Sequence, residues 1–187
     1  YSNRGVILQE MKRFDEALLS YDSAIKLNPN HFFSHGNKGI TLKNLNRYDE
    51  AIKSYDKAIQ INPNFIEAYN NKGNALKDLK RFSEALDNYK KILEIKPEYE
   101  YNLGRVLHFS MFICDWKNFD KLSEKINIGL EKKNKVIEPF SFLGISDNPE
   151  HAKYAAEIYV INKLTKKFDI NPIIEKYNHK KPRIGYF

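Results

Sequence analysis

The sequence has a single cysteine, Cys114, among its 187 residues. One cysteine cannot form a disulfide within the chain, which favours a reducing compartment. We interpret Cys114 as a small buried hydrophobic residue rather than a reactive thiol. No apolar run approaches the ~18 residues of a membrane helix, and no basic and then apolar leader opens the chain. These absences predict a cytoplasmic protein without a membrane partner.

The sequence also has few residues that could form a metal or catalytic site. Five histidines stand singly, and with one cysteine they provide no zinc-ligand spacing. The net charge is +7, but the lysines are spread along the chain and no RNA- or DNA-binding motif accompanies them. We therefore expect no metal and no nucleic-acid partner. A nucleic-acid-binding solenoid stays an alternative that rests on the charge alone, and the same charge would favour encounters with acidic partners.

What the sequence does have is an internal repeat with a 34-residue period. Seven positions of its central unit are Gly39, Leu42, Tyr48, Ala51, Tyr55, Ala58 and Pro63. The equivalents one period earlier are Gly5, Leu8, Phe14, Ala17, Tyr21, Ala24 and Pro29. The equivalents one period later are Gly73, Leu76, Phe82, Ala85, Tyr89, Ile92 and Pro97. A helix-turn-helix unit of this period is typical of the tetratricopeptide repeat, so we predict an all-α right-handed superhelix of stacked helix pairs, an α-solenoid.

Packing explains why these residue types recur. Each glycine lies inside the first helix of its unit, where it lets the second helix approach, and we expect the alanine of that helix opposite it. The tyrosine is expected to fill the gap to the next unit. Asp15, Asp49 and Ser83 are expected to cap the second helices, and the prolines are expected to end them.

The repeat pattern predicts helices over 1–11, 15–28, 32–44, 49–62, 66–78 and 83–96, followed by a degenerate fourth pair over 98–112 and 117–133. Residues 1–97 therefore form three repeats, the first of them shortened at its start, and residues 98–133 form the fourth pair. Residues 134–181 are predicted to be a linker and helical cap, with a loop over 134–147, a long helix from about 148 to 167 capped by Asp147 or Asn148, and a short helix over 170–177. Residues 182–187 are predicted to begin a strand.

Beyond the repeats, a series of short motifs resembles the bacterial branch of the O-linked N-acetylglucosamine transferase family. The motifs are Asn102, Leu103, Gly104, Leu107 and His108, then Cys114, Asp115, Trp116 and Phe119, then Pro139 and Phe140, then Asp147, Asn148 and Pro149, and finally Pro182, Arg183, Ile184, Gly185 and Tyr186. The resemblance implies that Cys114, Asp115 and Trp116 mark the junction after the last repeat, and that residue 183 opens the first catalytic strand. It also implies a parent enzyme that uses a nucleotide sugar such as UDP-GlcNAc. This chain itself is then expected to hold no cofactor and no catalytic residue. From the residues alone we read Asp115 as a helix-start cap beside a packing indole.

The expected binding residues lie on the inner face of the repeats. Asn3, Asn37 and Asn71 recur at the 34-residue shift, and an asparagine amide can both donate to and accept from a peptide backbone. The resembled family uses such an asparagine row in this way, and the alternative is a merely solvated polar stripe. Asn74 is predicted to lie on the same concave face, and Arg105 takes the corresponding position in the fourth pair.

We therefore expect a protein or peptide acceptor in the concave groove, and pairing of solenoids into a homo-oligomer stays open. The alternative function is a non-enzymatic tetratricopeptide adaptor. A clamp for a C-terminal carboxylate is disfavoured. With Asn3 and Asn37 as its asparagines, Glu67 and Asn71 stand where such clamps place cations. With Asn37 and Asn71 instead, Tyr101 and Arg105 supply only half a clamp, and Phe33 stands where its first lysine belongs.

Overall fold

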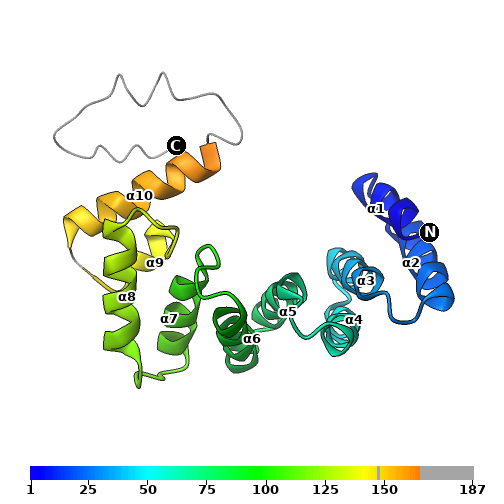
Figure 1. Cartoon of the computed structure of the whole chain (residues 1–187), viewed down its shortest axis with the longest axis horizontal. Coiled ribbons are helices and arrows are strands. Elements are labelled where there is room, and N and C mark those ends of the chain that lie inside the picture. The colour runs from blue at the N-terminus through cyan, green and yellow to red at the C-terminus, as the bar shows by residue number, and fades with distance from the viewer. Residues whose placement is uncertain (147, 165–187) are drawn as a thin grey trace. The chain divides into compact units, whose positions relative to one another are not determined.

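The structure, a computed structural model, describes residues 1–146 and 148–164, and all regular secondary structure within those ranges is helical (Figure 1). The chain divides into two compact units, described separately below. The first unit contains Tyr1–Pro97 and Phe109–Cys114, and the second contains Glu98–His108 and the chain from Asp115 onward.

The helices of the first unit form consecutive antiparallel pairs. They are α1 (Ser2–Glu10), α2 (Phe14–Leu27), α3 (Phe32–Asn44), α4 (Tyr48–Ile61), α5 (Ile66–Asp78) and α6 (Phe82–Ile95). Each helix packs on the next one along the chain, and α3 also contacts α1 and α5. In Figure 1, α3 and α5 lie on one side of the row and α4 and α6 on the other. The predicted α-solenoid is thus confirmed, with helix bounds within about one residue of those expected for α2 to α6.

Within each repeat, a tyrosine ring of the second helix lies directly on a glycine of the first. The pairs are Gly5 with Tyr21, Gly39 with Tyr55, and Gly73 with Tyr89. A Cβ atom built on Gly39 would stand only 2.5 Å from Cε1 of Tyr55, and all three tyrosines are fully buried. In each pair the three atoms nearest to such a Cβ all belong to the tyrosine ring. Ala17, Ala51 and Ala85 are also fully buried, but the tyrosine fills the space beside the glycine of its own repeat.

Burial makes two of these tyrosines harder to ionise. It raises the pKa of Tyr21 to about 12, and it raises the pKa of Tyr55 further above the ordinary value. The Tyr21 hydroxyl donates a 3.4 Å hydrogen bond to Oε1 of Gln9, while the Tyr55 hydroxyl has no partner among the described residues. Packing of the rings, rather than a shared hydrogen bond, is therefore the common feature of the three repeats.

The turn after each first helix uses a left-handed backbone conformation that recurs once per period. The φ angles are 58° at Lys12, 58° at Asn46, 59° at Lys80 and 57° at Cys114. In the three repeats the following arginine N–H donates to the carbonyl oxygen five residues earlier, as in a Schellman helix end. Cys114 is exposed, so the prediction that it is buried was wrong. It occupies the turn position that follows α7 (Asn102–Phe112), so the left-handed conformation of the repeats recurs there.

The second helices begin differently from the expectation. Their N-cap residues are arginines, without side-chain capping bonds, so Asp15, Asp49 and Ser83 are not the caps. Each arginine instead makes a two-pronged ion pair with a glutamate three residues later: Arg13 with Glu16, Arg47 with Glu50, and Arg81 with Glu84. These helices end two residues before Pro29, Pro63 and Pro97, as predicted.

The second unit contains α8 (Phe119–Glu131), α9 (Pro139–Leu143), α10 (Pro149–Leu164) and the start of α7 (Asn102–Phe112), whose last residues belong to the first unit. The predicted loop over 134–147 thus contains a short helix, which begins at a proline, a residue favoured at a first helical position. Asn148 caps α10, since its Oδ1 accepts hydrogen bonds from the N–H groups of Glu150 and His151 at 3.0 and 3.3 Å. The expected helix over 170–177 and strand over 182–187 lie outside the described residues.

The glycine and tyrosine packing generates a prediction for stability. Replacing Gly39 by Ala should lower the free energy of unfolding, because overpacking a rigid core site costs roughly 1–3 kcal/mol. That cost equals or exceeds the ~1 kcal/mol by which alanine stabilises a helix relative to glycine. The control is Gly144→Ala at the exposed end of α9, because a Cβ there would make only an ordinary 3.6 Å contact with the Ser141 carbonyl oxygen.

We therefore expect Gly144→Ala to leave stability unchanged or to raise it slightly, and Gly39→Ala to lower it. Urea unfolding followed by circular dichroism measures both. Equal stability of the two variants would contradict the role assigned to the tyrosine ring.

Candidate peptide-binding groove

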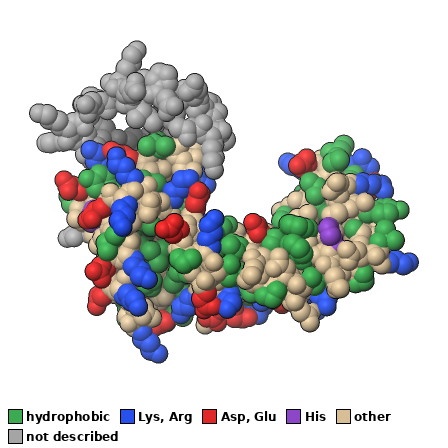
Figure 2. Space-filling view, in the orientation of Figure 1, with side chains coloured by type: hydrophobic (Ala, Val, Ile, Leu, Met, Phe, Trp, Pro, Cys, Tyr) green, Lys and Arg blue, Asp and Glu red, His purple; other side chains and the backbone are tan. Residues whose placement is uncertain are grey.

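A groove of about 280 Å³ lies between α3 and α5, the first helices of the second and third repeats. The residues of α3 that line it are Phe33, Gly36, Asn37 and Ile40. The other lining residues are Phe65, Glu67, Ala68 and Asn71. Figure 2 shows hydrophobic side chains (green) over this part of the repeats, among backbone and side chains that are neither hydrophobic nor charged (tan). We call this site the α3–α5 groove.

Two amide side chains face the α3–α5 groove. Asn37 and Asn71 occupy equivalent positions of successive repeats, both are half-buried, and both line it. Neither side chain has a hydrogen-bond partner among residues 1–146 and 148–164. Amides removed from water are normally hydrogen-bonded. The donors and acceptors of this pair are therefore available to a ligand, and the structure brings together two of the three asparagines that the sequence singled out.

Aromatic rings form one wall of the groove. The centroids of Phe33 and Phe65 are 5.4 Å apart and the rings meet edge to face at 77°. Phe32 supports both, with centroid distances of 4.1 Å to Phe33 and 5.0 Å to Phe65. Such edge-to-face contacts hold aromatic rings in fixed relative positions. Phe33 nevertheless remains 50% exposed, so the wall offers apolar surface to a ligand.

Glu67 is the charged residue of the groove lining. It is exposed and has no ion pair within the described part of the chain. The lysines on the same helices point to partners elsewhere, because Lys38 pairs with Asp22 at 2.6 Å and Lys72 pairs with Asp56 at 2.5 Å. The lining of the groove is therefore negative although the whole chain is positive.

The sequence pattern predicted the two amides but not the rest of the groove lining. Phe33 and Glu67 were noted only as residues that do not fit a carboxylate clamp, and Phe65 and Ile40 were not predicted to bind a ligand. The 34-residue shift could have predicted that Phe33 and Glu67 also line the groove. They occupy equivalent positions of successive repeats, one helical turn before Asn37 and Asn71.

The other expected binding residues do not line the groove. Asn3 lies exposed on α1. Asn74 is half-buried, and its Oδ1 accepts a 2.9 Å hydrogen bond from the Tyr89 hydroxyl, so it is engaged within its own repeat. Arg105 lies on α7 in the second unit.

The three predicted junction residues are located at the turn between α7 and α8. Cys114 is exposed, and Trp116 is 54% exposed with its ring 5.4 Å from that of Phe119. Asp115 accepts a long hydrogen bond of 3.4 Å from the Lys117 N–H, but α8 begins only after Asn118. Asp115 is therefore a turn residue rather than the cap expected for this helix, and the indole is only partly packed.

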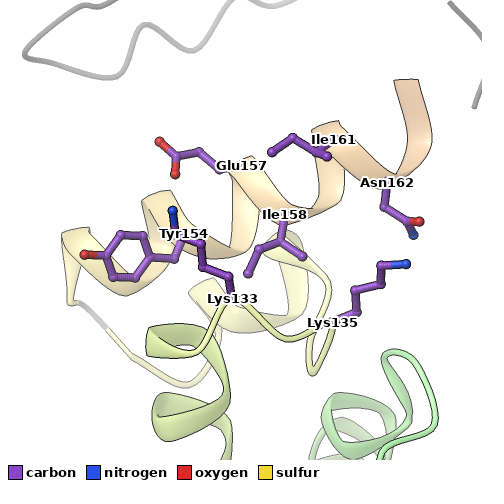
Figure 3. Close-up of a pocket in the computed structure, with 7 residues that line it drawn as sticks. All are labelled: Lys133, Lys135, Tyr154, Glu157, Ile158, Ile161 and Asn162. Carbon is purple, nitrogen blue, oxygen red and sulfur yellow. The ribbon is translucent and has the colours of Figure 1, made fainter. Parts of the chain in front are cut away.

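A second pocket, of about 300 Å³, lies in the second unit between α10 and the loop after α8. Figure 3 shows Lys133 and Lys135 on that loop and Tyr154, Glu157, Ile158, Ile161 and Asn162 on α10. Two of its polar groups already serve the fold, because Lys135 pairs with Glu100 at 2.7 Å and Asn162 donates to the Tyr101 hydroxyl at 3.0 Å. We therefore assign this pocket a structural role.

Neither a metal site nor a membrane span is found in the part of the chain that the structure describes. No group of three or more histidine, cysteine, aspartate or glutamate side chains there could hold a metal ion. Every described helix is too short or too polar to cross a bilayer.

Comparison with known proteins identifies the repeats. Models of the tetratricopeptide repeat match residues 1–31, 20–53, 39–80 and 66–99, which together cover more than half of the chain. The chain therefore belongs to the tetratricopeptide-repeat family. No curated protein sequence matches it significantly.

Solved structures agree with this fold at low sequence identity. The first tetratricopeptide domain of Spaghetti (RPAP3), bound to the HSP90 peptide SRMEEVD, is 20% identical, with 60% of this chain and 90% of that chain covered and a TM-score of 0.57. The tetratricopeptide domain of Arabidopsis OM64 is 22% identical, with 59% of this chain and 92% of that chain covered and a TM-score of 0.56. MamA from Desulfovibrio magneticus RS-1 is 21% identical, with 66% of this chain and 70% of that chain covered and a TM-score of 0.57.

The different surroundings of Asn71 and Asn74 generate a prediction. Asn74→Ala removes the acceptor of the Tyr89 hydroxyl and should lower the free energy of unfolding by about 1–3 kcal/mol, as expected when a buried hydrogen bond is lost. Asn71→Ala removes no internal hydrogen bond and should change stability by less than about 0.5 kcal/mol. Thermal and urea unfolding of both variants measure the difference, and equal destabilisation would contradict the assignment of Asn74 to the fold.

Proposed function

We propose that the α3–α5 groove binds an extended peptide segment of another protein, with Asn37 and Asn71 hydrogen-bonded to the peptide backbone. The observation that carries the proposal is that both amides line one groove and have no partner within the described fold. An amide can accept from one backbone N–H and donate to one backbone C=O. Such contacts bind main chain with little dependence on its sequence, while the apolar wall adds contact area.

The comparisons support a peptide ligand in general terms. The Spaghetti (RPAP3) domain has the same fold and is bound to a peptide of HSP90. At 20% identity this likeness concerns the fold, so the mode of binding must come from the residues of this chain. Those residues, two amides, aromatic rings and one carboxylate, suit an internal stretch of backbone better than a free C-terminal carboxylate.

The test is the double variant Asn37→Ala/Asn71→Ala. Each amide should contribute about 0.5–1.5 kcal/mol to binding, because a neutral hydrogen bond mostly replaces one to water. Loss of both should weaken peptide binding by roughly 1–3 kcal/mol, or roughly 5- to 150-fold in Kd, if the two act independently. Fluorescence titration of a labelled peptide library measures the change.

The matched control is Asn30→Ala/Asn64→Ala, which removes two exposed amides, also one period apart, from the turns between repeats. We expect the control to bind like the wild type and both proteins to remain helical by circular dichroism. A folded groove variant with unchanged affinity would refute the backbone-binding role of the asparagines.

Two kinds of parent protein fit this peptide-binding role. The motifs of residues 102–187 support an arm that presents acceptor polypeptides to an O-GlcNAc transferase-like catalytic domain using UDP-GlcNAc. The family matches cover the repeats and support a non-enzymatic scaffold equally well.

Calorimetry with UDP-GlcNAc and a transfer assay with labelled sugar distinguish them. We expect the full-length protein to bind and transfer the sugar, and residues 1–187 alone to do neither. A full-length protein without nucleotide-sugar binding would favour the scaffold, and sugar transfer by residues 1–187 would contradict the expectation that they hold no catalytic residue.

A further inference from the structure

We propose that the α3–α5 groove selects internal peptide segments that carry an apolar side chain and a basic side chain two residues apart, and that it disfavours acidic C-terminal peptides. This inference rests on the proposed function and adds the chemical class of the ligand. It is carried by the aromatic wall, by the charge of the lining and by the pairing of the nearby lysines.

The aromatic wall calls for an apolar side chain. Phe33 is 50% exposed although Phe32 and Phe65 hold its ring in place. Gly36 allows the Phe65 ring to lie against α3, because a Cβ at that position would stand 2.8 Å from Cε1 of the ring. The result is a preformed apolar surface on one side of the groove. Burial of such surface by a ligand is favourable, and a ligand without an apolar group would leave it in water.

The charge of the groove calls for a basic side chain. Glu67 is the lining residue that bears a charge, and it has no ion pair within the described residues. A cationic ligand group would pair with it, whereas a carboxylate there would be repelled. Lys38 and Lys72 pair with Asp22 and Asp56 and are not among the residues that line the groove.

The positive charge of the whole chain does not reverse this preference. The net charge of +7 attracts acidic peptides from a distance, but interactions between exposed charges are screened beyond about 8 Å at physiological ionic strength. The group in direct contact with the ligand therefore decides which peptide stays bound, and long-range attraction mainly affects the association rate.

Strand geometry sets the spacing. In an extended peptide, alternate side chains point to the same side, and residues two apart are separated by about 6.5–7 Å. Phe33 and Glu67 line the same groove from neighbouring helices, at equivalent positions of their repeats. An apolar and a basic side chain on one side of the strand can reach both, while the backbone between them meets the two amides.

The experiment compares labelled eight-residue peptides in a glycine and serine background, with both ends blocked. One carries leucine and lysine two residues apart, in either order. The others replace the lysine by glutamate or the leucine by alanine, and SRMEEVD with a free carboxylate is the acidic C-terminal probe. Fluorescence anisotropy at physiological salt should show the leucine and lysine peptide binding roughly 3- to 10-fold tighter than the glutamate peptide. SRMEEVD should bind no tighter than the glutamate peptide.

Variants test the two residues separately. Glu67→Lys should reverse the preference between the lysine and glutamate peptides, whereas Asp87→Lys, the same charge change on exposed α6 surface, should preserve it. Phe33→Ala should remove the difference between the leucine and alanine peptides. The control Leu19→Ala truncates a side chain that is 69% exposed on α2 and should preserve that difference.

The outcomes distinguish this inference from the proposed function. Equal binding of all peptides that still depends on Asn37 and Asn71 would overturn the peptide class and leave backbone binding intact. Tighter binding of the glutamate peptide or of SRMEEVD would also overturn the class. Failure of every peptide to bind the wild type would overturn both proposals. The proposed peptide class is supported if the wild type prefers the lysine peptide over the glutamate peptide, Glu67→Lys reverses that preference and Asp87→Lys preserves it.

Discussion

The contact between a tyrosine ring and a glycine backbone determines how the two helices of every repeat pack. Tyr55 covers Gly39 so closely that a single added carbon on the glycine would overlap the ring. Because the same contact recurs in three repeats, the first helices present equivalent positions at equivalent places. Residues one period apart can therefore line one surface, and the α3–α5 groove depends on that regularity.

Contacts between repeats then decide the chemistry of the groove. Lys38 and Lys72 form ion pairs with the second helix of the preceding repeat, which keeps their charge out of the groove lining. Exposed ion pairs of this kind contribute little stability. Their consequence here is electrostatic, since they leave Glu67 as the charge that a ligand meets beside apolar rings and unpartnered amides.

The turn after α7 shows that a backbone feature of the repeats recurs where their sequence pattern has faded. Leu107 and Phe119 replace the glycine and alanine of the repeats, yet Cys114 has the same left-handed turn conformation as Lys12, Asn46 and Lys80. A position that requires positive φ usually selects glycine or asparagine. Here it accepts lysine and cysteine as well as asparagine, so residue type alone does not identify the turn or the exposed position of Cys114.

The helical repeat, its bounds and the two central asparagines could be predicted from the sequence, because a 34-residue period and helical spacing are properties of consecutive residues. Three-dimensional packing was needed to establish which ring fills the space beside each glycine and that the Phe65 ring lies against Gly36. It was also needed to show that Asn74 accepts a hydrogen bond from Tyr89, whereas the Asn71 side chain has no partner among the described residues. Those choices depend on side-chain volumes and on partners that meet across helices, often in different repeats. Periodicity places such residues on a face, but only close packing shows what each of them contacts.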